Sequence, residues 1–195
     1  FLLPQKEHFI WDKELYLDLL GQGLAMGLMT SIVSIGTVTL QTSINALGAT
    51  IISAQTSARR IMSFSMLPVS AIASSLTTFT SQNLGANRPQ RIQRGIYLGS
   101  MVAIIWTIFI AITLFFASPA LNELISGSTD PELISNASLY NRISSSFYPV
   151  LAVLLVLRNS LQGLGQKITP LISSFIELFG KILFVLLIIP STGYM

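Results

Sequence analysis

The sequence predicts an all-α protein that crosses a membrane several times, as a polytopic helix bundle. Of its 195 residues, 51% are hydrophobic and only 10% are charged, whereas a soluble domain has about 25% charged residues. The ranges 19–58, 61–87 and 95–122 contain no charged residue. Each range is longer than the roughly 20 residues that a helix needs to cross a hydrocarbon layer of about 30 Å. These ranges predict membrane-spanning helices, and the segment boundaries along the chain bring the predicted number to five.

The chain divides into a lead-in and the five predicted helices. Residues 1–21 mix apolar and charged side chains and carry Trp11, as expected of a cytoplasmic, interfacial lead-in to the first span. The helices are predicted to cover about 22–45, 51–84, 92–117, 133–161 and 168–189. We expect Gly48 to follow the end of the first helix, Pro68 to kink the second and Pro119 to lie just beyond the end of the third.

Basic residues indicate how the chain is oriented. The connection SQNLGANRPQRIQRG, at 81–95, gathers Arg88, Arg91 and Arg94 between two apolar segments. Because arginines are costly to move through lipid and collect on the cytoplasmic side, this connection and the N-terminus are predicted to face the cytoplasm. We expect the protein in the plasma or inner membrane. The net charge of +3 does not indicate nucleic-acid binding, since the basic residues lie at segment ends without interleaved aromatic side chains.

Few side chains are available for catalysis or metal binding. The chain has no cysteine and one histidine, His8, which we interpret as an interfacial residue rather than a metal ligand. No paired carboxylates lie within the predicted helices, and QGLGQK, at 162–167, lacks the preceding strand that a phosphate-binding loop requires. We therefore expect no cofactor and no enzymatic activity.

Polar and small residues recur every three or four positions along 23–45 and 60–81, so each set lies on one helix face. Two interpretations stay open, because small and hydroxyl residues serve tight packing between membrane helices but also line water-accessible cavities. Gln41 and Asn45 favour a cavity, since side-chain amides are buried at a cost without partners. The candidate cavity or substrate-path residues are Ser34, Thr37, Gln41, Asn45, Arg60, Ser63 and Ser70.

Charged residues within the predicted helices have two interpretations each. Arg60 heads the polar face of the second helix, and an arginine inside a membrane faces a cavity or a partner unless it extends to the headgroups, as we expect of one of the pair Arg59 and Arg60. Glu177 and Lys181 lie four residues apart on the fifth helix, so they share one face. We favour a structural ion pair over an ion-coupling site, because a paired carboxylate resists protonation.

Three stretches resemble the multidrug and toxic compound extrusion (MATE) family. They are Gln82-Asn83-Leu84-Gly85-Ala86 with the arginines after it, the first helix and turn at 23–61, and the SSFYPV to ELFGK segment at 145–181. The resemblance extends over about residues 15–195 and is carried by the combined pattern rather than by one motif.

The resemblance implies a transporter of two six-helix lobes that rock to give alternating access. Such a transporter exchanges amphipathic, often cationic, organic compounds for Na⁺ or H⁺. This chain would supply helices seven to eleven of twelve, that is, five helices of the C-terminal lobe. Its implied partners are the lipid bilayer, the N-terminal lobe of the same chain and a small organic substrate.

The chain departs from the family pattern at places that bear on ion coupling. Gly23-Leu24-Ala25 stands where the family has Gly-Leu-Pro, and Ser81 replaces the common glycine before Gln82. The first helix has no carboxylate after Asp18, and the fourth has none after Glu132. The chain therefore resembles the DNA-damage-inducible-type branch, whose coupling carboxylate lies in the other lobe. A lipid-linked sugar flippase of the same superfold and a non-transporting scaffold or receptor module remain alternatives.

Overall fold

The computed structural model describes residues 12–45 and 48–183, which form helices and no strands. The predicted all-α fold class is confirmed for these residues. His8 and Trp11 lie outside the described ranges. The helices are α1 (Lys13–Asn45), α2 (Ala49–Gly85), α3 (Pro89–Ser126), α4 (Pro131–Ser146), α5 (Tyr148–Gly163) and α6 (Ile168–Leu183).

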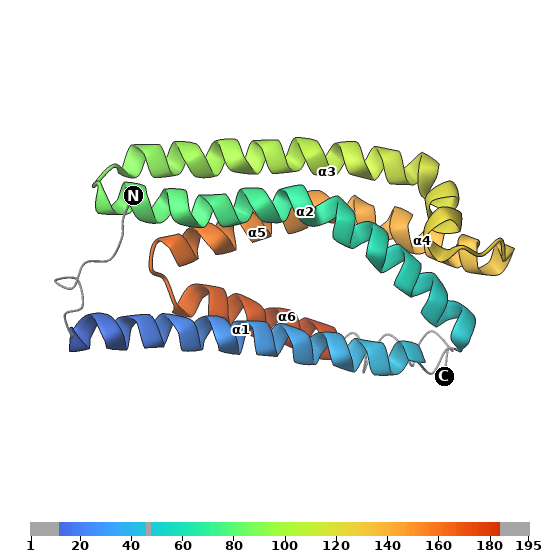
Figure 1. The fold of residues 1–195 in the computed structure, drawn as a ribbon, viewed down its shortest axis with the longest axis horizontal. Coiled ribbons are helices and arrows are strands. Elements are labelled where there is room, and N and C mark those ends of the chain that lie inside the picture. The colour runs from blue at the N-terminus through green and yellow to red at the C-terminus, as the bar shows by residue number, and fades with distance from the viewer. Residues whose placement is uncertain (1–11, 46–47, 184–195) are drawn as a thin grey trace, which may run out of the picture.

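The helices form two groups that run roughly along one direction. Figure 1 shows α1 beside α6 along one edge, while α2, α3 and α5 pack together along the other. The α2–α3 turn, the α5–α6 turn and the start of α1 lie at one end of the bundle, and α4 lies at the opposite end (Figure 1). Basic residues of the two turns and of the start of α1 therefore gather at one end of the bundle, where Lys167 forms an ion pair with Asp18 of α1.

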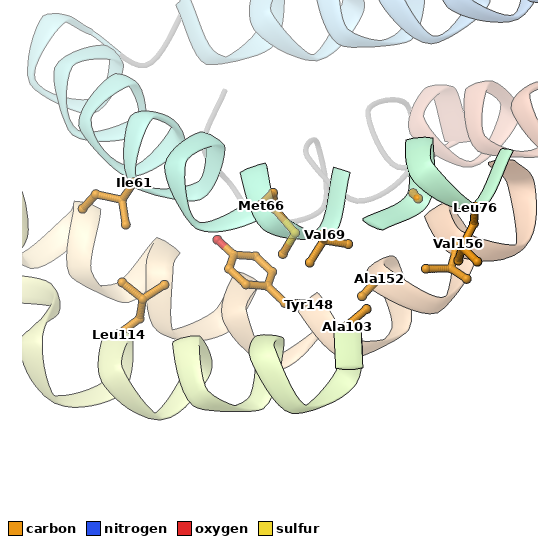
Figure 2. Close-up of a cluster of buried hydrophobic side chains, with 10 residues drawn as sticks. Ile61, Met66, Val69, Leu76, Ala103, Leu114, Tyr148, Ala152 and Val156 are labelled. Carbon is orange, nitrogen blue, oxygen red and sulfur yellow. The ribbon is translucent and has the colours of Figure 1, made fainter. Parts of the chain in front are cut away.

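The buried core lies between α2, α3 and α5. It comprises Ile61, Met66, Val69, Ala73, Leu76, Ala103, Leu114, Tyr148, Ala152 and Val156. Figure 2 shows the Tyr148 ring near Met66 and Val69, with Ala103 and Ala152 close by. The small alanines allow the helix backbones to approach closely, as is usual in membrane helix packing. Many large apolar side chains outside this core are exposed, among them Phe109 and Phe116 of α3, as expected where lipid surrounds the bundle.

Fewer described helices meet the criteria for a membrane span than the five that the sequence predicts. Three helices, α1, α2 and α3, are long and apolar enough, and α4 with α5 makes a fourth if this bent pair is one span. The structure describes α6 over only 16 residues. The predicted continuation of this helix to residue 189 lies outside the described ranges.

The first helix begins well before residue 22. Asp12 precedes α1, and its carboxylate accepts hydrogen bonds from the backbone amides of Glu14 (3.0 Å) and Leu15 (3.2 Å). A side-chain cap of this kind satisfies amides that have no partner within the helix. Residues 13–21, predicted as part of a separate lead-in, are therefore the first turns of α1.

The third helix continues through Pro119 to Ser126, beyond the end at residue 117 that the sequence predicts. A proline within a helix leaves the carbonyl four residues earlier without its usual donor, and here that carbonyl belongs to Phe115. Arg142 of α4 replaces the missing donor, because its Nε donates a hydrogen bond of 3.0 Å to the Phe115 oxygen. The same guanidinium lies 5.4 Å from the centroid of the Phe115 ring, a favourable cation–π distance.

The predicted helix at 133–161 is two helices that meet at Phe147 with a bend of 54°. Pro149 causes this break, because it has no N–H to donate to the Ser145 carbonyl. At the break, the Phe147 amide donates a hydrogen bond of 3.0 Å to the Ser144 carbonyl, three residues earlier, which closes a tighter turn than an α-helix has.

At the start of α4, Asp130 accepts a hydrogen bond from the Glu132 amide (3.0 Å) and caps the helix.

Candidate functional site

Two adjoining cavities lie near the end of the bundle that is opposite the basic turns. The first cavity, of about 420 Å³, is lined by Gln41 of α1 and by seven residues of α2: Gln55, Thr56, Arg59, Arg60, Ser63, Phe64 and Leu67. One hydrogen bond joins its two helices, from Arg59 Nη1 to Gln41 Oε1 at 3.2 Å. This bond orients the Gln41 amide, whose Nε2 also donates to Asn45 Oδ1 at 3.0 Å.

The second cavity, of about 660 Å³, continues from the first toward α4 and α6. It shares Gln41, Gln55 and Arg59 with the first cavity, so the two form one region lined by both polar and apolar side chains. The remaining lining residues are Thr37, Leu40, Ile44, Met62, Tyr140, Glu177, Gly180 and Lys181. We call the two cavities together the α1–α2 vestibule.

Four of the seven cavity candidates from the sequence line this vestibule. Thr37, Gln41, Arg60 and Ser63 come together there from α1 and α2. Asn45 holds the Gln41 amide without lining either cavity. The other two candidates, Ser34 of α1 and Ser70 of α2, are exposed on their helices and line neither cavity.

The hydroxyl groups of the polar faces are mostly satisfied within their own helices. Ser34 donates to the Thr30 carbonyl (2.8 Å), and Thr37 donates to the Val33 carbonyl (3.0 Å). Ser63 likewise donates to the Arg59 carbonyl at 2.9 Å. Thr77 is different, because its hydroxyl reaches Asn159 of α5 at 3.1 to 3.2 Å. The tight-packing interpretation therefore describes the Thr77 end of the α2 polar face, and the vestibule occupies the end that carries Arg60.

A three-residue ion network borders the vestibule. Glu177 Oε1 is 2.8 Å from Lys181 Nζ, and Glu177 Oε2 is 3.3 Å from an Arg158 nitrogen on α5. Arg158 is mostly buried, with 11% of its side chain exposed, and it also donates to Ser173 of α6. Glu177 and Lys181 thus form the predicted pair, and Arg158 adds a second cation that links α5 to α6.

Several vestibule residues are absent from the sequence-based set. Gln55 and Thr56 lie four residues before Arg59 and Arg60, so continuing each helical spacing by one turn finds them. Tyr140 belongs to α4, and Arg158, which contacts the vestibule residue Glu177, belongs to α5. No pattern in the sequence connects them with α6, because these contacts depend on how the helices pack.

The fold and the vestibule together define a class of protein, a multi-pass helical membrane protein with a polar region between its helices. The chain belongs to the MatE family, whose model matches residues 25–187. The family resemblance seen in the sequence is therefore confirmed.

Two known proteins resemble the chain over part of their lengths. A protein of Shewanella oneidensis described as an FAD transporter is 28% identical over 119 residues, which is 61% of this chain and 26% of that protein. A crystal structure of MATE in complex with MaL6 matches the fold with a TM-score of 0.77 and 19% identity. The match covers 94% of this chain and 42% of that one. The chain thus spans about a quarter of the curated relative and less than half of the solved structure.

Proposed function

We propose that this chain is part of the C-terminal lobe of a secondary active antiporter, which exports amphipathic organic compounds in exchange for Na⁺ or H⁺. The observation that carries the proposal is the α1–α2 vestibule, in a chain that belongs to the MatE family. The lipid bilayer and the N-terminal lobe are the other partners that this function requires.

We place the coupling carboxylate outside these residues, in the N-terminal lobe, as in the DNA-damage-inducible-type branch. Glu177 is poorly suited to release and rebind ions, because two cations already hold it. Within residues 12–45 and 48–183, no group of three or more His, Cys, Asp or Glu side chains is arranged to hold a metal ion. Both observations support a coupling site elsewhere in the complete transporter.

Transport is tested with the complete chain in proteoliposomes carrying an imposed Na⁺ or H⁺ gradient. Arg60→Ala should lower gradient-driven export of a fluorescent amphipathic dye that the wild type exports, while leaving the amount of protein in the membrane unchanged. Arg91→Ala, in the first turn of α3 at the other end of the bundle, is the matched control and should export like the wild type. Wild-type export by Arg60→Ala would remove this residue from the substrate path.

Access of water to the vestibule is tested by cysteine labelling, to which residues 1–195 contribute no background because they contain no cysteine. Gln41→Cys and Ser63→Cys should react with a membrane-impermeant maleimide in the intact protein. Val69, which is 0% exposed, provides the control, and Val69→Cys should stay unlabelled. Equal protection of all three positions would favour the non-transporting scaffold.

We further propose that the protein lies in the plasma or inner membrane with the start of α1 in the cytoplasm. Lys13, Arg88 and Lys167 lie at the same end of the bundle as that start, which supports this orientation through the excess of basic residues in cytoplasmic loops. Labelling of Asn87→Cys only after the membrane is permeabilised would agree with it. Labelling from outside intact cells would reverse it.

A second candidate cargo is FAD, which is favoured by the relative described as an FAD transporter. Vesicles containing the complete chain would be loaded with FAD or with riboflavin, which lacks the nucleotide phosphates, and the loss of each would be followed by flavin fluorescence. Gradient-dependent loss of FAD but not riboflavin would favour this cargo over a general organic compound.

A further inference from the structure

The vestibule contains more positive than negative charge. Arg59, Arg60 and Lys181 line it, whereas Glu177 is the one acidic residue among the described residues that line it. Glu177 is already paired with Lys181 at 2.8 Å and with Arg158 at 3.3 Å. This carboxylate therefore has no charge left to neutralise Arg59 or Arg60.

The two adjacent arginines have no acidic partner in the described part of the chain. Arg59 donates to the neutral amide of Gln41, and Arg60 makes no hydrogen bond or ion pair to another described residue. Residues 49–85 include no Asp or Glu, and α1 includes none beyond Asp18. Arg59 lies ten residues into α2, about 15 Å along the axis from its start. Two adjacent cations without an acidic partner, on a helix of a membrane protein, favour an accompanying anion or water.

Neighbouring groups complete a site with a polar part and an apolar part. Gln55 is half-buried beside Arg59, and its amide makes no hydrogen bond among the described residues. Phe64 and Leu67, about one and two turns beyond Arg60, line the same cavity with 69% and 60% of their surfaces exposed. An arginine pair suits the oxygens of a phosphate or carboxylate, because guanidinium groups donate several hydrogen bonds in a fixed geometry. The apolar pair suits a hydrocarbon or aromatic group.

We infer that the α1–α2 vestibule binds an amphipathic anion, whose phosphate or carboxylate group lies at Arg59 and Arg60 and whose apolar part covers Phe64 and Leu67. The inference deepens the proposed transport function by naming the charge of the cargo. Cationic cargo, which the family resemblance alone implies, is repelled by the same arginines. The anionic group has two possible sources, a soluble cargo or the headgroup of an anionic phospholipid.

The inference is tested by binding rather than transport, so that its failure is distinct from failure of the transport function. The complete chain is placed in nanodiscs of phosphatidylcholine, and binding of 1-naphthyl phosphate is compared with that of 1-naphthylmethylammonium. The phosphate should bind measurably more tightly. Arg60→Gln should weaken phosphate binding about tenfold to hundredfold, the loss expected for a hydrogen bond between charged groups. Arg60→Lys, which keeps the charge, should recover part of that affinity.

Arg91→Gln is the matched control, since it removes an arginine at the far end of the bundle. Its affinity for the phosphate probe should stay within about twofold of the wild type, well below the tenfold change that corresponds to roughly 1.4 kcal/mol.

A second arm identifies the source of the anion by replacing part of the lipid with phosphatidylglycerol. Phosphatidylglycerol that competes with naphthyl phosphate, and that copurifies with the wild type but not with Arg60→Gln, supports the vestibule site with a headgroup as its occupant. Phosphate binding that this lipid leaves unchanged supports a soluble cargo.

Two results would overturn the inference. One is tighter binding of the ammonium probe than of the phosphate probe by the wild type. The other is equal phosphate affinity in Arg60→Gln and Arg91→Gln, with both variants eluting as the folded wild type does in size-exclusion chromatography. If the fluorescent dye is still exported under either result, the proposed transport function stands and the anionic cargo is rejected.

Discussion

The close contact between α2 and α5 depends on a glycine, and Gly163→Ala tests it. Gly163 is the last residue of α5. A Cβ atom at this position would lie inside contact distance of the Thr77 carbonyl oxygen, and within 3.0 Å of the Thr80 Cβ. The Thr77 oxygen belongs to the backbone of α2 and cannot rotate away, so the whole helix contact must open. The hydrogen bonds from the Thr77 hydroxyl to Asn159, at 3.1 to 3.2 Å, lie at the same contact.

The expected change in the free energy of unfolding caused by Gly163→Ala follows from two opposing effects. Forcing an extra carbon into a packed contact costs about 1–3 kcal/mol. Replacing glycine by alanine within a helix gains up to about 1 kcal/mol, but the gain is smaller at a helix end. We therefore expect a net destabilisation of about 1–2 kcal/mol. At about 2–4 °C per kcal/mol for a domain of this size, the apparent melting temperature should fall by several degrees.

The assay heats the complete chain in detergent and measures the fraction that still elutes as a monodisperse peak. Gly27→Ala is the matched control, because Gly27 lies within α1 and a Cβ there meets no atom within 4 Å. That variant should melt at the wild-type temperature or slightly above it. If Gly163→Ala also melts at or above the wild-type temperature, α2 and α5 do not approach so closely that Gly163 is required.

Three further predictions concern single side chains and are measured by the same melting assay. Arg142→Gln should destabilise the protein by about 1–3 kcal/mol, because the Phe115 carbonyl loses its donor; adding Pro119→Ala should recover most of this loss, since the alanine supplies the missing backbone amide, and no recovery would refute the assignment. Glu177→Gln should destabilise by about 1–3 kcal/mol, a range below that of a fully buried pair because 35% of the Glu177 side chain is exposed; an unchanged melting temperature would show that the two flanking cations are solvated. Asp130→Ala should cost about 1 kcal/mol through loss of the α4 cap, and Asp130→Asn, which keeps an acceptor, should cost less.

Local patterns in the sequence were sufficient for the membrane class and for placing several residues of the candidate lining on common helix faces. Charge-free ranges longer than a bilayer crossing predict helices, because a helix satisfies every backbone polar group within one apolar segment, as lipid requires. Helical spacing alone placed Thr37 and Gln41 on one face, and Arg60 and Ser63 on another. These inferences succeed because both the crossing length and the helical repeat act over a few turns of one segment.

Tertiary structure decided which of those faces meet and where the helices end. Pro119 by itself predicts the end of a helix, but α3 continues through it. Arg142, 23 positions further along the chain, supplies a hydrogen-bond donor to the Phe115 carbonyl. Arg158 and Glu177 are 19 positions apart in the sequence, and the arrangement of α5 and α6 brings their side chains within 3.3 Å. Such contacts join segments that are distant in sequence, and their energies depend on geometry that no local spacing encodes. The sequence therefore determined the helices and their polar faces, and only packing determined the vestibule.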